Sequence, residues 1–507
     1  MIIENAPNGK KNLQFFSLDI STEMRYRKLV PAAGKGPSAR GAFFRKERGF
    51  FAMRSHQTDL TSGPLGRQIF AFSVPLMFSN VLQVLFNMAD IAVAGRFGGP
   101  RALGAVGSTA ILVSLFTGFL IGVGSGVNVM VARYLGAREE KNAEETVHTS
   151  LLLSVIIGLA LLLIGQAGVR GLLELLGTKE ELIDGAELYL RIYFLGMPAL
   201  ALYNFGNAVF SAQGDTRKPL LFLSLAGALN IALNLLLVIV FHLDEAGVAI
   251  ASVVSQYASA ALILIALGRN PSCVGLRRGR LRLHGDKARQ VLRLSLPAGA
   301  QNSIFAIANL FIQAGVNSFD AVVVEGNSAA ANADGLVYDV MAAFYTACSS
   351  FMSQNYGAGK RKRVLHSYLV SLAFSFIAGG VLGGALVLFG PQFLSLFTED
   401  AAVAAEGMTR LRVMAFSYAF SAFMDCAIAA SRGLGKSVVP TIIVILGSCV
   451  FRVIWVYTVF AYFHTILSLY LLYIFSWTIT AAAETLYFIH CYRQCLIRPG
   501  GALPAGE

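Results

Sequence analysis

Charged residues are scarce in this sequence. Aspartate, glutamate, lysine and arginine make up 14% of its 507 residues, whereas 55% of the residues are hydrophobic. The mean hydropathy of +0.62 is far higher than that of an average globular protein. The composition therefore excludes an ordinary soluble protein and predicts a polytopic, all-α membrane protein.

Paired cysteines and clustered histidines are also missing. The six cysteines form no CxxC pair, and none has a histidine at metal-ligand spacing. We therefore predict no disulfide framework and no zinc site. The HExxH and GxSxG motifs of membrane-embedded enzymes are absent, and there is no repeated filter-like loop of a channel. We expect neither an enzyme nor a protein-bound cofactor.

The formal charge of +12 does not indicate a nucleic-acid partner. Lysines and arginines lie almost entirely between hydrophobic segments, where they act as topology signals. The long basic segment 269–289 is expected to fix topology and to attract anionic lipid. We therefore expect a lipid bilayer, and no nucleic acid, as the surroundings of this chain.

Apolar runs long enough to cross a membrane recur along the chain. A crossing helix needs about 20 mostly apolar residues, and a scan finds two sets of six such runs. They lie near 67–94, 102–132, 146–168, 183–210, 219–241, 247–268, 290–316, 329–355, 364–389, 403–431, 438–462 and 466–490. The sequence thus predicts an amino-terminal lobe (65–268), a basic linker (269–289), a carboxyl-terminal lobe (290–490) and a tail (491–507).

The two halves repeat at a nearly fixed offset. Matching residues lie 221 or 222 positions apart, by subtraction, in the pairs Gly136 and Gly357, Arg191 and Arg412, Pro219 and Pro440, and Pro75 and Pro297. Because each half has an even number of spans, both copies have the same orientation. We predict two six-helix bundles related by a pseudo-twofold axis along the membrane normal, with a central cleft between them.

Basic residues mark one side of the membrane. They follow every second span, in the stretches 133–141, 217–218, 277–289, 360–363 and 432–436, whereas the opposite loops contain few. These loops and both termini are predicted to be cytoplasmic. Residues 1–64 are polar and basic, and we interpret them as a disordered cytoplasmic extension. Two alternatives are a true start at Met53 and a transit peptide.

Several strings in this order resemble the multidrug and toxic compound extrusion (MATE) family of cation-coupled antiporters. The first half carries PLMFSNVLQVLFNMADIAVAGRFG, ALGAVGST, SAQGDTRKP, LNIALNLLLV and AGVAIASVVSQ. The second half carries LPAGAQNSIFAIANLFIQAGVNSF, GNSAAANADGLVY, QNYGAGKRKR and ASRGLGKSVVP. The resemblance covers about residues 60 to 490 and implies a bacterial inner-membrane exporter of small organic compounds, acting as a monomer. Alternating access between the lobes would drive export.

Asp90 lies in the middle of the first span. An aspartate there costs about 2.5–3.5 kcal/mol to insert, so it should face a wet cavity and have a function. The resemblance implies that Asp90 couples export to a cation. The alternative is that Asp90 only hydrogen-bonds neighbouring helices.

Further polar residues of the first half are candidates for the same site. Asn230 and Asn234 are four residues apart and share one helix face. By resemblance, Asn207 in span 4 and Ser252 in span 6 match other polar positions of the family's site. Many relatives have an aspartate where this chain has Asn234, so the choice between H⁺ and transported Na⁺ stays open. We expect no other metal.

The second half differs from the first. It has Ile312 where the first half has Asp90, and Phe305 where another branch of the family has a glutamate, so coupling is expected in the first lobe alone. A direct ion pair between Asp425 and Arg452 is the favoured interpretation of these residues. Candidates for the cleft or the substrate site are Asp339, Asp425, Glu484, Phe86, Met88 and Tyr345.

Two alternatives accompany these assignments. Glu484 lies near a helix end, where it could reach the lipid headgroups. A flippase for lipid-linked saccharides would also have paired bundles, but it is expected to place several arginines inside the cleft. This chain has few intramembrane arginines, which favours export.

Overall fold

The computed structural model describes residues 59–497, which contain helices and no strand. Most of the predicted extension (1–58) and the end of the predicted tail (498–507) lie outside the described residues. Within them the all-α prediction is confirmed. The prediction for a disordered extension stays a prediction.

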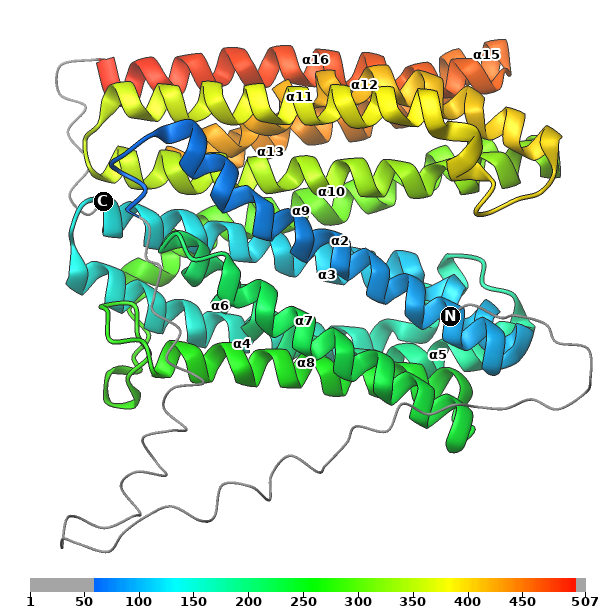
Figure 1. Ribbon diagram of the computed structural model, residues 1–507, viewed down its shortest axis with the longest axis horizontal. Coiled ribbons are helices and arrows are strands. Elements are labelled where there is room, and N and C mark those ends of the chain that lie inside the picture. Colours follow the sequence, from blue (N-terminus) through cyan, green and yellow to red (C-terminus); the bar gives the residue numbers. More distant parts are fainter. Residues whose placement is uncertain (1–58, 498–507) are drawn as a thin grey trace, which may run out of the picture. The chain divides into compact units, whose positions relative to one another are not determined.

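The first six spans are seven helices, because the fourth span is broken (Figure 1). Their bounds are α2 (Leu65–Phe97), α3 (Gly99–Gly136), α4 (Glu140–Leu175), α5 (Glu180–Phe194), α6 (Met197–Ala212), α7 (Arg217–Asn234) and α8 (Asp244–Gly268). The break between α5 and α6 falls at Leu195 and Gly196, just before Pro198, because proline suits the first turn of a new helix. Helix α7 continues as a π-helix over Leu235–Val240.

The second six spans follow the same order. They are α9 (Gly285–Val316), α10 (Ala321–Gly357), α11 (Arg361–Leu394), α12 (Ala401–Gly433), a composite span and α16 (Ile466–Tyr492). The composite span consists of α13 (Val438–Val444), α14 (Phe451–Trp455) and α15 (Ala461–Phe463), joined by π-helices over Ile445–Val450 and Val456–Phe460. The structure thus has the twelve predicted spans as two lobes of six.

Nine helices of the described residues are long and apolar enough to cross a membrane by length and composition. The other three spans are the broken α5–α6 pair and the helices α9 and α10. The last two have ample length but carry more polar residues. Polar residues on two central helices are expected where a lobe interface or a wet surface replaces lipid.

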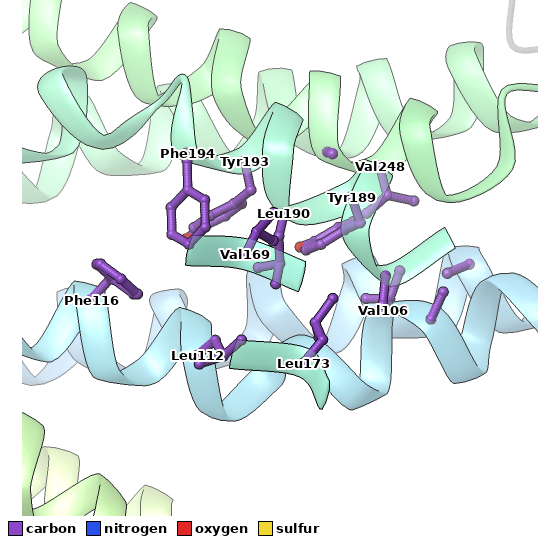
Figure 2. Close-up of a cluster of buried hydrophobic side chains, with 14 of the residues drawn as sticks. Val106, Leu112, Phe116, Val169, Leu173, Tyr189, Leu190, Tyr193, Phe194 and Val248 are labelled. Atoms are coloured by element: carbon purple, nitrogen blue, oxygen red, sulfur yellow. The ribbon is translucent and has the colours of Figure 1, made fainter. Parts of the chain in front are cut away.

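The first lobe is held together by a hydrophobic core between α3, α4, α5 and α8. Figure 2 shows its side chains pointing toward one another, with Phe116 of α3 facing Phe194 of α5. The two rings meet edge to face at 4.8 Å. Tyr189 and Tyr193 of α5 stack in the same core. The core fixes α5 against α3, and it thereby sets how deep Tyr189 and Tyr193 lie within the first lobe.

The two lobes make their most extensive contact where α3 crosses α9. A side chain at Gly122 would lie within 2.6 Å of the backbone of Ala298, so this crossing requires glycine. One turn further along, Ser295 donates a hydrogen bond of 2.8 Å to the carbonyl of Val123. Small residues that allow close backbone contact are typical of helix interfaces in membranes.

Helix α2 runs obliquely between the lobes (Figure 1). In its first half, Asn80 donates a hydrogen bond of 2.8 Å to the backbone carbonyl of Asp339 in α10. Its second half instead packs on α7 within its own lobe. Helix α2 therefore links the second lobe to the interior of the first.

Hydrogen bonds between the lobes lie at the helix midpoints or toward the end that carries the basic loops, called the basic end below. On α3 they begin at Leu115 and continue through Asn128, whose side chain accepts a hydrogen bond of 2.9 Å from Ser350. They end at Tyr134, whose hydroxyl donates one of 2.8 Å to Gln290 of α9. Gln354 adds one of 2.6 Å to the carbonyl of Ala212. Within residues 59–497 no hydrogen bond joins the lobes beyond the midpoints. The basic end is thus closed.

A short segment before α2, Asp59–Pro64, is fastened to the second lobe at the basic end and is called the strap below. Asn355 donates a hydrogen bond of 3.1 Å to the carbonyl of Leu60. Lys360 donates one of 2.7 Å to the carbonyl of Thr61. Leu60 itself is fully buried. The start of the first lobe is therefore tied to the loop between α10 and α11.

Arg363 makes the largest number of bonds to the strap. Its guanidinium donates hydrogen bonds of 2.8 Å to the carbonyls of Ser62 and Gly63, and one of 2.9 Å to the side chain of Gln68. Two of the basic residues in the run 360–363 thus hold the strap, in addition to any role as topology signals.

Asp59 stabilises the strap from within. Its carboxylate accepts hydrogen bonds from the backbone N–H and hydroxyl of Thr61 and from the hydroxyl of Ser62. Partial burial raises the pKa of Asp59, but these hydrogen bonds and the charge of Lys360 outweigh that effect and hold its pKa below the ordinary value of 3.8. The strap thus contains a carboxylate that is ionised at neutral pH.

Candidate functional site

Asp90 is the buried acid of the first lobe. It lies in the second half of α2, and only 8% of its surface is exposed. Its carboxylate accepts hydrogen bonds from two other helices: 2.5 Å from the side-chain amide of Asn234 and 2.9 Å from the hydroxyl of Ser252. Asp90 thus points into its own lobe, toward α7 and α8, and away from lipid.

Asn230 closes these contacts into a ring. The amide of Asn234 also donates to the side-chain oxygen of Asn230 at 3.2 Å, and the amide of Asn230 donates to the hydroxyl of Ser252 at 3.3 Å. The four side chains Asp90, Asn230, Asn234 and Ser252 are called the Asp90 ring below. The structure therefore brings together four of the five residues that the sequence suggested for one site.

The Asp90 ring contains no basic side chain. None of the ion pairs within residues 59–497 includes Asp90. The side-chain oxygen of Asn234 is buried and has no hydrogen-bond partner among the described residues. A carboxylate with nearby amide and hydroxyl oxygens can take up a proton or a hard cation. The chemistry available here is reversible neutralisation of one negative charge.

Local sequence explains why the ring forms. Asn230 and Asn234 share a face of α7 because they are four residues apart. One turn before Asn230, a side chain at Gly227 would collide with the ring of Phe86. Glycine there lets α2 approach α7, so that Asp90, one turn beyond Phe86, reaches Asn234. Sequence reasoning missed Gly227, although a lone glycine in an apolar helix is a usable signal of close packing.

Asn207 makes no hydrogen bond to the ring, so the structure does not bring it together with the other four, and its role in cation coupling stays a prediction. Its side-chain oxygen is buried with no partner among the described residues. The tyrosines that interact electrostatically with Asp90 are Tyr189 and Tyr193 of α5. Gly206, the neighbour of Asn207, packs on Ile263 of α8. Ile263 lies 11 residues beyond Ser252 by subtraction, which is about 16 Å along that helix. Asn207 is in the correct span but at a different depth.

The aromatic and methionine candidates lie in both lobes. Phe86 is half-buried and packs on α7 in the first lobe. Met88 is 41% exposed and is free to contact lipid or substrate. Tyr345 lies in the second lobe, where its ring meets Tyr338 edge-on at 6.3 Å. Their assignment to the cleft or the substrate site stays a prediction.

The acids of the second lobe differ in their surroundings. Asp425 accepts a hydrogen bond of 2.8 Å from the hydroxyl of Tyr338. It forms no ion pair with Arg452 in the described residues, so the predicted direct pair is wrong. Asp339 is half-buried, and its backbone carbonyl makes the bond to α2 described above.

Glu484 is completely buried in α16. Both oxygens of its carboxyl group are buried and have no hydrogen-bond partner among the described residues. Its proposed exposure to lipid headgroups is therefore wrong, and it does not line an open surface in this conformation. The sequence placed Glu484 near a helix end but could not show that neighbouring helices cover that end.

A single family model, described as MatE, matches the chain twice, over residues 75–236 and 297–458. The chain belongs to the MatE family. The two matches are offset by 222 residues (297 − 75), so both lobes are copies of one unit, and the predicted internal repeat is confirmed. The family consists of transporters, and its membership gives no indication of catalytic activity.

Two relatives and one solved structure illustrate the similarity. The chain is 29% identical over 365 residues to the probable multidrug resistance protein YpnP of Bacillus subtilis, covering 71% of this chain and 81% of that protein. It is 28% identical over 351 residues to a FAD transporter of Shewanella oneidensis, covering 68% and 77%. A MOP superfamily transporter from Pyrococcus furiosus has the same fold, with a TM-score of 0.82, 22% identity and coverage of 88% and 99%.

Proposed function

We propose that this MatE-family chain exports small organic compounds across the bacterial inner membrane by antiport against H⁺ or Na⁺. The observation that carries the proposal is the Asp90 ring, a buried carboxylate without a basic partner among the described residues. An entering cation can neutralise this charge, and a leaving cation restores it. The relatives, which include a multidrug resistance protein and a FAD transporter, support small organic compounds as cargo.

Alternating access follows from the arrangement of the lobes. The basic end, which we assign to the cytoplasm, is closed by hydrogen bonds and by the strap. Beyond the midpoints, the four helices at the lobe interface carry polar side chains that are exposed, namely Gln83, Asn87, Ser114, Asn309 and Asn332. Such residues are unfavourable against lipid, which supports a wet cleft open to the outside. We expect the chain to act as a monomer.

The arrangement of α2 offers a route for coupling. This helix carries Asp90 in its second half. Asn80 in its first half donates a hydrogen bond to α10 of the other lobe. Neutralising Asp90 weakens the hydrogen bonds that it accepts from Asn234 and Ser252. A shift of α2 relative to α7 then changes the contact of α2 with the second lobe. Ion binding and lobe movement thereby become one event.

Export is favoured over the flippase alternative by the arginines of the spans. Arg191 pairs with Glu187 at 2.7 Å, and Arg410 pairs with Asp334 at 2.5 Å. Both are committed to acids of the chain, and Arg412 is exposed. Arg452 is then the one buried arginine of these four without an ion pair among the described residues, whereas a flippase for polyanionic lipids is expected to have several.

Transport in proteoliposomes tests the proposal. One positive charge entering down 100 mV yields about 2.3 kcal/mol, or about a fiftyfold gradient of a neutral substrate. We expect wild type to accumulate a fluorescent substrate against its gradient, whereas Asp90→Asn only equilibrates it. Asp286→Asn, which removes an exposed acid at the start of α9, is the matched control. Full accumulation by Asp90→Asn would refute the proposal, and imposing a proton or a sodium gradient separately identifies the ion.

A further inference from the structure

Arg452 of α14 is a buried cation in the second lobe, with 2% of its surface exposed. Its Nε donates a hydrogen bond of 3.2 Å to the hydroxyl of Ser476, and Nη1 donates one of 3.4 Å to the side chain of Asn309. Its Nη2 is buried and has no partner within residues 59–497. No ion pair of these residues includes Arg452. The guanidinium therefore forms no ion pair among the described residues, and Asp425, which accepts its hydrogen bond from Tyr338, acts on it only electrostatically from beyond contact distance.

Arg410 of the same lobe shows what a structural arginine looks like in this fold. Its guanidinium binds the carboxylate of Asp334 through two nitrogens, at 2.5 and 3.2 Å, and a third nitrogen donates to Asn327 at 2.7 Å. The hydroxyl of Tyr418 donates to the same carboxylate. Arg410 thus has a full set of partners, and Arg452 lacks the anion that completes such a set.

Aromatic rings surround the guanidinium of Arg452. Its carbon lies 4.7 Å from the ring centre of Tyr473 and 5.7 Å from those of Phe305 and Trp477. These rings come from α9 and α16, on either side of α14. The guanidinium lies over these rings, which surround its N–H donors with apolar groups and so favour binding of a negative group. Phe305 is partly exposed and can pack on an apolar ring system.

The approach to Arg452 is from α9. Asn309 is exposed and contacts the guanidinium directly, and it lies among the polar side chains that face the proposed outer cleft. Movement of the Asn309 side chain would uncover Nη1 beside the unpartnered Nη2. Two parallel donors in one plane fit a carboxylate or a phosphate.

We propose that Arg452, with Tyr473, Phe305 and Trp477, binds aromatic organic anions carrying a carboxylate or phosphate group, and that such anions belong to the exported compounds. The inference rests on the proposed export function. It assigns opposite charges to the two lobes: the first holds an acid for the cation, and the second holds a base for the cargo.

Binding to the purified protein in a neutral detergent tests the assignment. The probes are flavin mononucleotide and riboflavin, which share one ring system and differ by a phosphate, and fluorescence anisotropy of the flavin measures binding. We expect wild type to bind flavin mononucleotide at least about tenfold more tightly than riboflavin. Arg452→Gln should abolish this preference, and Arg452→Lys should keep part of it. Arg412→Gln, which removes an exposed arginine of α12, should leave it unchanged.

A second variant tests the same site if Arg452→Gln does not fold. Asn309→Asp introduces a carboxylate 3.4 Å or so from the guanidinium, where Asn309 now lies, and it should also remove the preference for the phosphate. Equal binding of both flavins to wild type, or a preference that survives Arg452→Gln or Asn309→Asp, would overturn the assignment. Asp90→Asn should keep the preference for the phosphate, because Arg452 lies in the other lobe, whatever its effect on the affinity for both flavins. A failure of ion coupling is thereby distinguished from a failure of this site.

Discussion

Removing the guanidinium of Arg363 should open the basic end of the protein. The change Arg363→Gln deletes three short hydrogen bonds: two of 2.8 Å to the strap and one of 2.9 Å to Gln68 in the first turn of α2. Because the strap begins the first lobe and Arg363 begins α11 of the second, these bonds exist only when the lobes meet at this end. Their loss therefore destabilises the closed conformation relative to the open one.

The size of the effect follows from the number of bonds. A hydrogen bond of this kind contributes about 0.5–1 kcal/mol net, toward the lower end of the usual range because Arg363 is only half-buried. Three bonds give about 1.5–3 kcal/mol, which corresponds to about a tenfold to 150-fold change in the equilibrium between conformations. We expect a value near the lower limit.

Labelling of a cysteine at the lobe interface measures this equilibrium. Ser350 is fully buried between the lobes, so Ser350→Cys should react with a charged maleimide only when the basic end opens. The two partly exposed native cysteines, Cys273 and Cys495, are replaced by serine in the test protein. Arg363→Gln should raise the labelling rate about tenfold or more.

The neighbouring Arg361 provides the control. It is exposed, and Arg361→Gln removes the same charge without touching the strap. Equal labelling rates in wild type and Arg363→Gln would refute the reasoning. So would an equal increase in both variants, because the effect would then arise from net charge and not from the bonds to the strap.

Two further predictions concern other charged groups. Because the pKa of Asp59 is lowered in the folded protein, its contribution to stability is present above its ordinary pKa of 3.8 and is lost as pH falls through the folded value. The melting temperature of Asp59→Asn should therefore lie below that of wild type by a constant amount between about pH 5 and 8, and the difference should shrink below about pH 4; a difference that grows on acidification would contradict this. Asp334→Asn leaves the buried Arg410 unpaired and should cost about 3–5 kcal/mol in thermal unfolding, whereas Asp334→Leu combined with Arg410→Met should recover most of that loss.

Much of the fold could be predicted from the sequence because a membrane restricts the chain to long apolar helices. The number of spans and the repeat were readable for this reason. Asp90 stood out because an acid is costly there, and Asn230 with Asn234 stood out because residues four apart share a helix face. These signals depend only on local sequence and on the cost of burying charge.

The depth of a side chain within the membrane, and the residues of other helices that it contacts, could not be predicted in the same way. The resemblance implied Asn207 for the site, but the break at Leu195 and Gly196 and the position of α5 decide which residues reach Asp90. For Glu484 the sequence left both the cleft and the headgroups open, and neighbouring helices bury it from both. Such outcomes depend on crossing angles and on covering helices, which one sequence does not reveal.

The π-helix after α7 has a counterpart in the second lobe. The segments Leu235–Val240 and Val456–Phe460 begin 221 residues apart (456 − 235), the offset at which the two halves repeat. A π-helix is rare and adds a residue to a turn, so its occurrence at matching positions is most simply explained by inheritance from a single ancestral half. The acid at position 90 is not shared, because Ile312 stands in its place. The same backbone irregularity thus follows Asn234 of the Asp90 ring in one lobe and lies four residues beyond the buried Arg452 in the other, so a shared scaffold carries an acid site on one side and a basic group on the other.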